Sequence, residues 1–137
     1  MTDFDLRKVP SEHIRSILGY MHHEYPTEGG VTIGEYGLPI YKAREMSLEH
    51  HVNDITQSYF YIPILREVLK AINYDGVRVK GLFGWTYLDN WEWGQYGDCY
   101  GVQTFNRSTL EKTYKRAIFD YSDFMQKHSK RDYPTDS

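Results

Sequence analysis

Apolar residues follow two kinds of spacing along this chain. In three segments they recur every three to four residues, as on one face of a helix, and in two segments they form short runs typical of strands. The patterns predict the order helix, strand, helix, strand, helix. Turn residues separate the segments, with Pro26 and Gly29-Gly30 after the first helix and Asn73-Tyr74-Asp75-Gly76 after the second.

The first two predicted elements lie between Ser11 and Glu35. Ser11 is a candidate N-cap for a helix whose apolar face is Ile14, Ile17, Leu18, Met21 and Tyr25. The run Val-Thr-Ile within Val31–Glu35 is rich in β-branched residues and predicts a buried strand. A loop with Pro39 and the pair His50-His51 follows.

The next helix and strand have longer patterns. The helix is predicted from about Asp54 to Ile72, and Pro63 within it should kink or delay the helix. The strand is predicted over Val77–Tyr87 and is apolar on both faces near its end. Strands of this kind alternating with helices predict parallel β/α units rather than a hairpin sheet.

The last predicted helix begins at a capping box formed by Ser108 and Glu111. Its apolar face would hold Leu110, Tyr114, Ala117, Ile118, Tyr121 and Met125, and after Lys127 the chain becomes polar. The whole pattern gives one domain over residues 1–137 without an internal boundary. Two parallel strands leave open edges and too little core, whereas about eight such units close a barrel. We therefore expect a partner, either the remainder of a barrel or a second chain.

Composition and charge exclude several classes of function. The net charge is −3, which argues against a nucleic-acid partner, and no apolar run reaches the length of a membrane span. Residues 1–10 lack the apolar core of a signal peptide, and the single cysteine, Cys99, makes no internal disulfide. These features favour a reduced, cytoplasmic compartment but leave the compartment open. The adjacent pairs His22-His23 and His50-His51 each offer one ligand at best to a common site, so we expect exposed histidines, no metal and no cofactor.

Two acidic residues follow the predicted strands, where active sites lie in parallel β/α folds. Glu35 ends the first strand, and Glu92 lies in the aromatic segment after the second. Carboxylates beside aromatic rings suit glycoside hydrolysis, because carboxylates act as nucleophile and acid while rings pack on sugar C–H faces. Helix caps or surface charges would leave the same pattern. Cys99 is interpreted as a small buried thiol rather than a nucleophile, and Arg44 and Glu45 as surface charges.

Two segments resemble family 1 glycoside hydrolases of the β-glucosidase type. Val31-Thr32-Ile33-Gly34-Glu35-Tyr36-Gly37 is similar to the strand that carries the family's nucleophile, and Trp85-Thr86-Tyr87-Leu88-Asp89-Asn90-Trp91-Glu92-Trp93 is similar to its Trp-Ser-Leu-x-Asp-Asn-Phe-Glu-Trp segment. The resemblance covers about residues 9–127. It implies the C-terminal portion of a (β/α)8 TIM barrel, namely the last two β/α units plus a preceding helix.

The resemblance also implies roles for single residues. Glu35 would be the catalytic nucleophile, Glu92 would bind outer sugar hydroxyls, and Trp85 and Trp93 would line the first sugar subsite. The ligand would be a β-glycoside or sugar. The chain departs from the family at Gly34, where Thr is usual, and at Gln57 and Cys99, where Arg is usual. The family's Asn-Glu-Pro motif, which holds the acid/base residue, does not occur in this sequence.

Three hypotheses follow for the function. The chain is part of a retaining β-glycosidase with the acid/base residue absent from it, and alone it would be inactive or weakly active. Alternatively, it is a non-catalytic sugar-binding or scaffold protein derived from such a barrel. In the third hypothesis it does not fold alone and associates with the missing N-terminal barrel portion or with itself.

Overall fold

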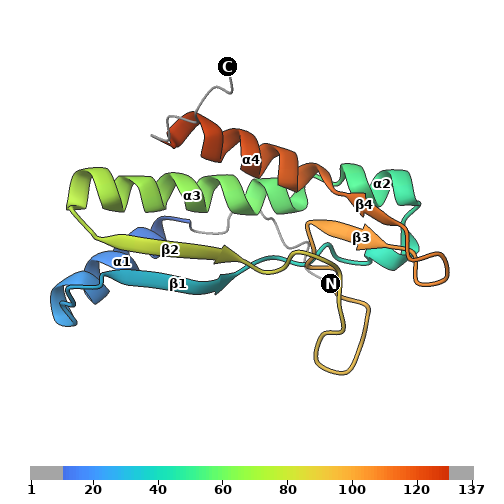
Figure 1. Ribbon diagram of the computed structural model, residues 1–137, viewed down its shortest axis with the longest axis horizontal. Coiled ribbons are helices and arrows are strands. Elements are labelled where there is room, and N and C mark those ends of the chain that lie inside the picture. The colour runs from blue at the N-terminus through green and yellow to red at the C-terminus, as the bar shows by residue number, and fades with distance from the viewer. Residues whose placement is uncertain (1–10, 130–137) are drawn as a thin grey trace, which may run out of the picture.

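The computed structural model describes residues 11–129 and shows the predicted order of helices and strands with four short elements added (Figure 1). The main helices are α1 (Glu12–Glu24), α3 (Thr56–Asp75) and α4 (Arg116–His128), and the main strands are β1 (Val31–Tyr36) and β2 (Val79–Gly84). The short elements are the 3-10 turn η2 (Ala43–Glu45), helix α2 (Leu48–Asn53), and strands β3 (Gln103–Phe105) and β4 (Lys112–Tyr114). None of the helices in this part of the chain is long and apolar enough to cross a bilayer.

Strands β1 and β2 pair in parallel, as the sequence predicts. The register sets Val31 beside Val79 and Ile33 beside Leu82, and it shifts between Val31 and Thr32 and again between Ile33 and Tyr36. A parallel pair needs a long crossover connection, and here α3 supplies it. Both strands end at the side of the molecule where the long loop between β2 and β3 hangs below the sheet (Figure 1).

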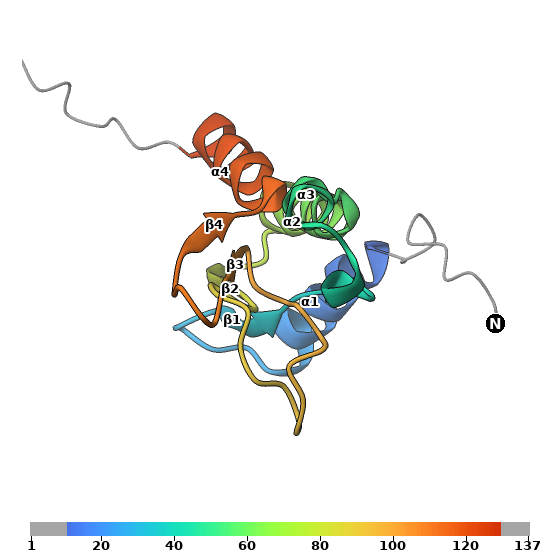
Figure 2. The same cartoon turned by 90° about the vertical axis from the view of Figure 1, so that its right-hand side faces the viewer.

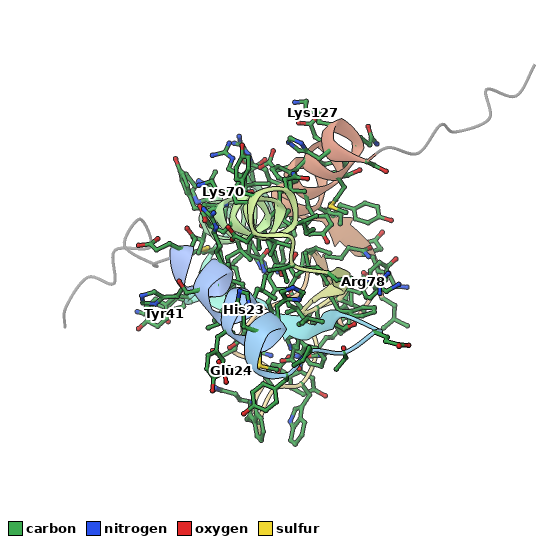
Figure 3. The ribbon with its side chains drawn as sticks, turned by 90° about the vertical axis from the view of Figure 1, so that its left-hand side faces the viewer. His23, Glu24, Tyr41, Lys70, Arg78 and Lys127 are labelled. Carbon is green, nitrogen blue, oxygen red and sulfur yellow. The ribbon has the colours of Figure 1, made fainter. Side chains whose placement is uncertain are left out.

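The hydrophobic core lies between the helices and one face of this strand pair. Leu18 of α1, Val68 and Ala71 of α3, and Val77 before β2 are buried together with Ile64. The partly buried Ile14, Val31, Ile33, Tyr36, Phe60 and Val79 pack against this cluster. Figure 2 shows α3 and α4 above the strands and α1 beside them, and Figure 3 shows Lys70 of α3 and Lys127 of α4 on the outer side of the helices. Burial of this apolar surface is the main force that holds the helices on the sheet.

An ion pair and a glycine fix the ends of α1 and α3. The guanidinium of Arg15 on α1 donates two hydrogen bonds to the carboxylate of Asp75, at 2.6 and 2.7 Å. Gly76 then ends α3 in the left-handed conformation, with φ at 68°, which glycine adopts without steric cost. The predicted turn at Asn73–Gly76 is thus where the chain reverses towards β2. Ser11 precedes α1 as predicted, but its side chain makes no capping hydrogen bond.

The predicted start of the last helix is wrong. Helix α4 begins at Arg116, and the preceding residues form an antiparallel hairpin in which β3 pairs with β4. The side-chain oxygen of Asn106 accepts hydrogen bonds from the backbone N–H groups of Ser108 and Thr109, at 2.8 and 3.2 Å, and so closes the hairpin loop. Ser108 and Glu111 therefore belong to a turn, because an asparagine turn competes locally with a helix N-terminus.

Two other boundaries differ from the prediction. Helix α3 begins before Pro63 and continues through it to Asp75, so the predicted delay is wrong. Proline removes only one N–H donor from the helix, and the buried apolar face of α3 on both sides of it offsets that loss. Strand β2 covers only the middle of the predicted Val77–Tyr87 range, because the chain leaves the sheet after Gly84.

Candidate active site

The four site residues predicted from sequence line one open pocket. It has a volume of about 540 Å³ and lies at the carboxyl ends of β1 and β2. Its wall consists of Glu35, Trp85, Trp91, Glu92, Trp93 and Gly94. Glu35 comes from β1, and the other five come from the loop after β2, so the parallel pairing of the strands brings the two segments together.

Glu92 is buried and is held by Trp85. The indole N–H of Trp85 donates to Oε1 of the Glu92 carboxylate at 2.9 Å. The backbone of Trp85 is fixed at two points. Its backbone N–H donates to the carbonyl of Tyr36 at 2.7 Å, and its backbone carbonyl accepts from the Tyr61 hydroxyl at 3.0 Å. The Trp85–Thr86 peptide bond is cis. The carboxylate thus has one oxygen fixed by Trp85, while its second oxygen makes no hydrogen bond within residues 11–129.

A tight turn presents Trp93 at the rim of the pocket. Glu92 and Gln95 exchange both backbone hydrogen bonds, at 2.7 and 2.9 Å. The two residues between them, Trp93 and Gly94, have φ angles of 43° and 97°, as two-residue hairpin turns require. The side chain of Trp93 is consequently 98 % exposed. A fully exposed indole beside two carboxylates is a surface suited to the apolar face of a ring-shaped ligand.

Glu35 is exposed on the face of the sheet opposite the helices. Tyr100 lies within the electrostatic reach of Glu35: burial, and then the carboxylates of Asp98, Glu92 and Glu35, raise the pKa of the Tyr100 hydroxyl. The hydroxyl therefore stays protonated beside these carboxylates and can donate a hydrogen bond. Tyr100 was not among the site residues predicted from sequence, because nothing in the sequence distinguishes it among the 13 tyrosines of the chain.

A buried ion pair anchors the loop that carries the pocket. Asp89 Oδ1 accepts from Lys115 Nζ and from the N–H of Gly101, both at 2.8 Å. Lys115 is fully buried, and burial lowers the pKa of its ammonium group against the opposing effect of Asp89. A Cβ on Gly101 would lie 2.2 Å from the backbone nitrogen of Asp89, so this close approach requires glycine. The amide of Gln57 adds hydrogen bonds to the carbonyls of Leu38, Tyr100 and Gly101, at 3.2, 2.8 and 3.3 Å.

Cys99 and the histidine pairs differ in their surroundings. Cys99 is buried, and burial raises the pKa of its thiol to about 11, which agrees with the predicted buried thiol rather than a nucleophile. His50 is exposed, as predicted, but His51 on α2 is buried, because α2 packs it against the Asp89 loop. Sequence alone could not show this, since both residues of the pair look alike.

The sequence profile described as "Glycosyl hydrolase family 1" matches residues 1–130. Among curated proteins, β-glucosidase 31 of Arabidopsis thaliana is 30 % identical over 123 residues, which are 87 % of this chain and 22 % of that protein. β-Glucosidase 1B of Phanerodontia chrysosporium is 32 % identical over 99 residues, covering 72 % of this chain and 18 % of that protein. The chain therefore spans only about a quarter or less of the relatives that it matches.

Solved structures share the fold. β-Glucosidase 2 from the fungus Trichoderma reesei, in complex with Tris, matches with a TM-score of 0.80 and 23 % identity over 85 % of this chain and 25 % of that one. A β-glucosidase from Humicola insolens in complex with glucose matches with a TM-score of 0.80 and 21 % identity, over 85 % of this chain and 25 % of that one. The family 1 β-glucosidase from Thermotoga maritima matches with a TM-score of 0.76 and 28 % identity, over 89 % of this chain and 27 % of that one. The predicted α/β fold, part of a (β/α)8 barrel, is thus confirmed.

Proposed function

Because this chain belongs to glycosyl hydrolase family 1, we propose that it supplies the nucleophile and the outer sugar-binding residues of a retaining β-glucosidase-type active site. The observation that carries the proposal is the pocket that joins Glu35 to Trp85, Glu92 and Trp93. Two segments far apart in sequence form one surface there, with carboxylates and indole rings in the combination that sugar hydrolysis uses.

In this proposal Glu35 attacks the anomeric carbon of a β-glycoside. The bond to the aglycone oxygen breaks, the sugar becomes bound to the Glu35 carboxylate, and water later releases it. Protonation of the leaving oxygen belongs to an acid/base residue outside these 137 residues, because the sequence has no Asn-Glu-Pro motif. Glu92 is not assigned that role, because its counterpart in the family binds sugar hydroxyls.

The same geometry supports a sugar-binding role for the remaining residues. Glu92 offers its second carboxylate oxygen to the outer hydroxyls of the sugar, and the fixed Trp85 ring keeps that carboxylate oriented. Trp93, at the rim, offers its ring to the C–H face of the sugar. Without the acid/base residue, activity on ordinary glucosides should be lower by about 10²–10⁴-fold than that of a complete site.

Covalent labelling tests the nucleophile separately from the missing acid. The chain is incubated with a 2-deoxy-2-fluoro-β-glucoside that carries a dinitrophenolate leaving group, and the intact mass is recorded. This leaving group needs no protonation, and the fluorine slows release of the sugar. We expect a mass gain that maps to Glu35, disappears in Glu35→Gln and persists in the control Glu45→Gln, an exposed glutamate of η2. Absence of the label from the unsubstituted chain would contradict a working nucleophile site.

A second candidate function is sugar binding without catalysis. The nearly complete exposure of Trp93 favours it, because an exposed indole at a pocket rim can bind a sugar face without any reaction. Titration with glucose while tryptophan fluorescence is recorded separates the two candidates. A saturable fluorescence change without covalent labelling would support the binding protein, and labelling at Glu35 would support the hydrolase.

A further inference from the structure

A second pocket is lined by other residues of the loop that carries the candidate active site. It has a volume of about 530 Å³ and is bordered by η2, α2 and the β3–β4 hairpin. Three of its lining residues, His51, Asp89 and Cys99, carry atoms that bind metal ions, and these atoms all lie within 4.8 Å of one another. All three residues are more than nine-tenths buried.

Two of these ligand atoms lack hydrogen-bond partners within the described part of the chain. They are Nε2 of His51 and Oδ2 of Asp89, which lie 3.7 Å apart. A buried polar atom without a partner costs free energy, so such atoms in a native protein call for a ligand or an ordered water. The site therefore holds two unsatisfied ligand atoms that are close enough to share one ligand.

The spacing suits a four-coordinate ion. With Zn–N and Zn–O distances near 2.0–2.1 Å and Zn–S near 2.3 Å, tetrahedral ligand atoms lie roughly 3.3–3.6 Å from one another. The distance of 3.7 Å between His51 Nε2 and Asp89 Oδ2 is close to that range. The ligand atoms of the three residues lie within 4.8 Å of one another, so the longest separation would have to shorten by about 1 Å when the ion binds. The adjoining pocket leaves room for a water molecule as the fourth ligand.

We propose that His51, Asp89 and Cys99 bind one divalent transition-metal ion, for which Zn²⁺ has the best-matched ligand set. A histidine nitrogen, a thiolate and a carboxylate oxygen are typical zinc ligands, and the soft sulfur disfavours Mg²⁺ and Ca²⁺. Binding releases the Cys99 proton to solvent, so the thiolate adds a negative charge as the ion enters.

The neighbouring lysine is compatible with this site. Lys115 contacts Oδ1 of Asp89 at 2.8 Å and leaves Oδ2 free for the ion. The charges of Lys115 and Asp89 balance before binding, and the new thiolate offsets half of the charge of the ion.

The test is titration of the 137-residue chain with Co²⁺, followed by absorbance. Because Cys99 is the only cysteine, a thiolate-to-cobalt charge-transfer band reports this residue alone. We expect saturation at one ion per chain and displacement by Zn²⁺. The band should be lost in Cys99→Ser, and the affinity should fall about tenfold or more in His51→Gln. His50→Gln, the exposed neighbour, is the matched control and should bind as the unsubstituted chain does.

Three results would overturn the proposal. One is the absence of a charge-transfer band in the unsubstituted chain. Another is unchanged affinity in His51→Gln. The third is equal weakening by His50→Gln and His51→Gln, which would mean that the ion gathers on a chain without an organised site.

Discussion

At the scale of single residues, Asp89 organises the loop that carries the candidate active site. Its carboxylate accepts hydrogen bonds from the Lys115 ammonium and the Gly101 N–H, and His51 lies 3.7 Å from its other oxygen. A buried charge is tolerated only when it is paired. Each of these contacts joins a different part of the chain to the same carboxylate, so the loop geometry depends on a few charged atoms.

Replacing Lys115 by methionine should therefore destabilise the protein. Lys115→Met leaves the Asp89 carboxylate buried and unpaired, and we expect the free energy of unfolding to fall by about 3–5 kcal/mol. Chemical denaturation followed by circular dichroism measures it. Lys112→Met, at an exposed position of β4, is the control and should change stability by less than about 0.5 kcal/mol. Equal stability of the two variants would show that the ion pair does not hold the loop.

The sequence predicted the residues that line the candidate active site but not the buried residues that anchor its loop. Glu35, Trp85, Glu92 and Trp93 belong to two continuous segments, and a short segment at a strand end is visible in sequence. The surroundings of His51 and Lys115 come from contacts between distant segments, so a buried charge there cannot be told from a surface charge. Tyr100 was missed for the same reason, because its relation to Glu35 and Glu92 exists only after folding.

At the scale of elements, the order of the main helices and strands could be predicted from sequence, whereas the residues at which they begin and end could be predicted less well. Helical spacing and β-branched runs predicted α1, β1, α3, β2 and α4, because burial of one face decides these elements. The start of α4 could not be predicted from Ser108 and Glu111, since the same residue types occur in turns. The Asn106 side chain and the pairing of β3 with β4 decide in favour of the hairpin.

Leu110 gives a direct test of that hairpin. It has φ at 62°, which strains a residue with a Cβ, and its side chain is 69 % exposed. Leu110→Gly should thus raise the free energy of unfolding by about 1 kcal/mol. In a helix that began at residue 108, the same substitution would lower it by a similar amount. Urea denaturation measures the sign of the change in the free energy of unfolding. Ser122→Gly, inside α4, serves as the helical control, for which we expect the free energy of unfolding to fall by roughly 0.5 kcal/mol.

A cluster of rings joins three elements beside the candidate active site. Tyr36 at the end of β1, Tyr61 on α3 and Tyr121 on α4 are linked by edge-to-face contacts, with ring centroids 5.3 and 6.0 Å apart. Burial raises the pKa of the Tyr61 hydroxyl to about 12, and it also raises the pKa of Tyr36. Both phenols therefore hold their protons in the folded state above the pH at which the unfolded chain releases them.

This difference predicts alkaline instability. The contribution of Tyr61 is fully present below pH 10.0, its ordinary pKa, and is lost as the pH rises through about 12. Each buried tyrosine should cost about 2 kcal/mol of stability over that range. Urea unfolding at increasing pH measures it, and Tyr36→Phe should reduce the loss. Tyr74→Phe, at a position 77 % exposed, should leave the pH dependence unchanged, and the same loss in both variants would contradict the assignment.

At the scale of the whole molecule, one face of the β1–β2 pair is uncovered. The helices pack on one side, while Thr32, Glu35 and Lys80 are exposed on the strands together with Phe83, which is 61 % exposed. A two-stranded sheet with open edges is a template for further pairing. The remaining units of a family 1 barrel would cover this face, and a second copy of the chain is the other candidate.

We expect the isolated chain to self-associate through this face. Sedimentation velocity should show a weight-average mass above that of one chain, rising with concentration. Phe83→Lys should shift the distribution towards monomer, because a charge on the uncovered face disfavours pairing. Phe119→Lys is a matched control, since Phe119 is also 61 % exposed but lies on α4. Identical distributions for the two variants would place the contact elsewhere.

The parallel pairing of β1 with β2 also determines when this sheet can form during synthesis. Val31 pairs with Val79, and all of α3 lies between them in the chain. While the ribosome adds α2 and α3, β1 cannot yet form its pairing with β2, and the α3 side chains of its core have not all been made. Nascent chains in that interval expose unpaired backbone and apolar surface, which chaperones bind. The pairing of β1 with β2 therefore has to wait until Gly84 has emerged, long after Tyr36.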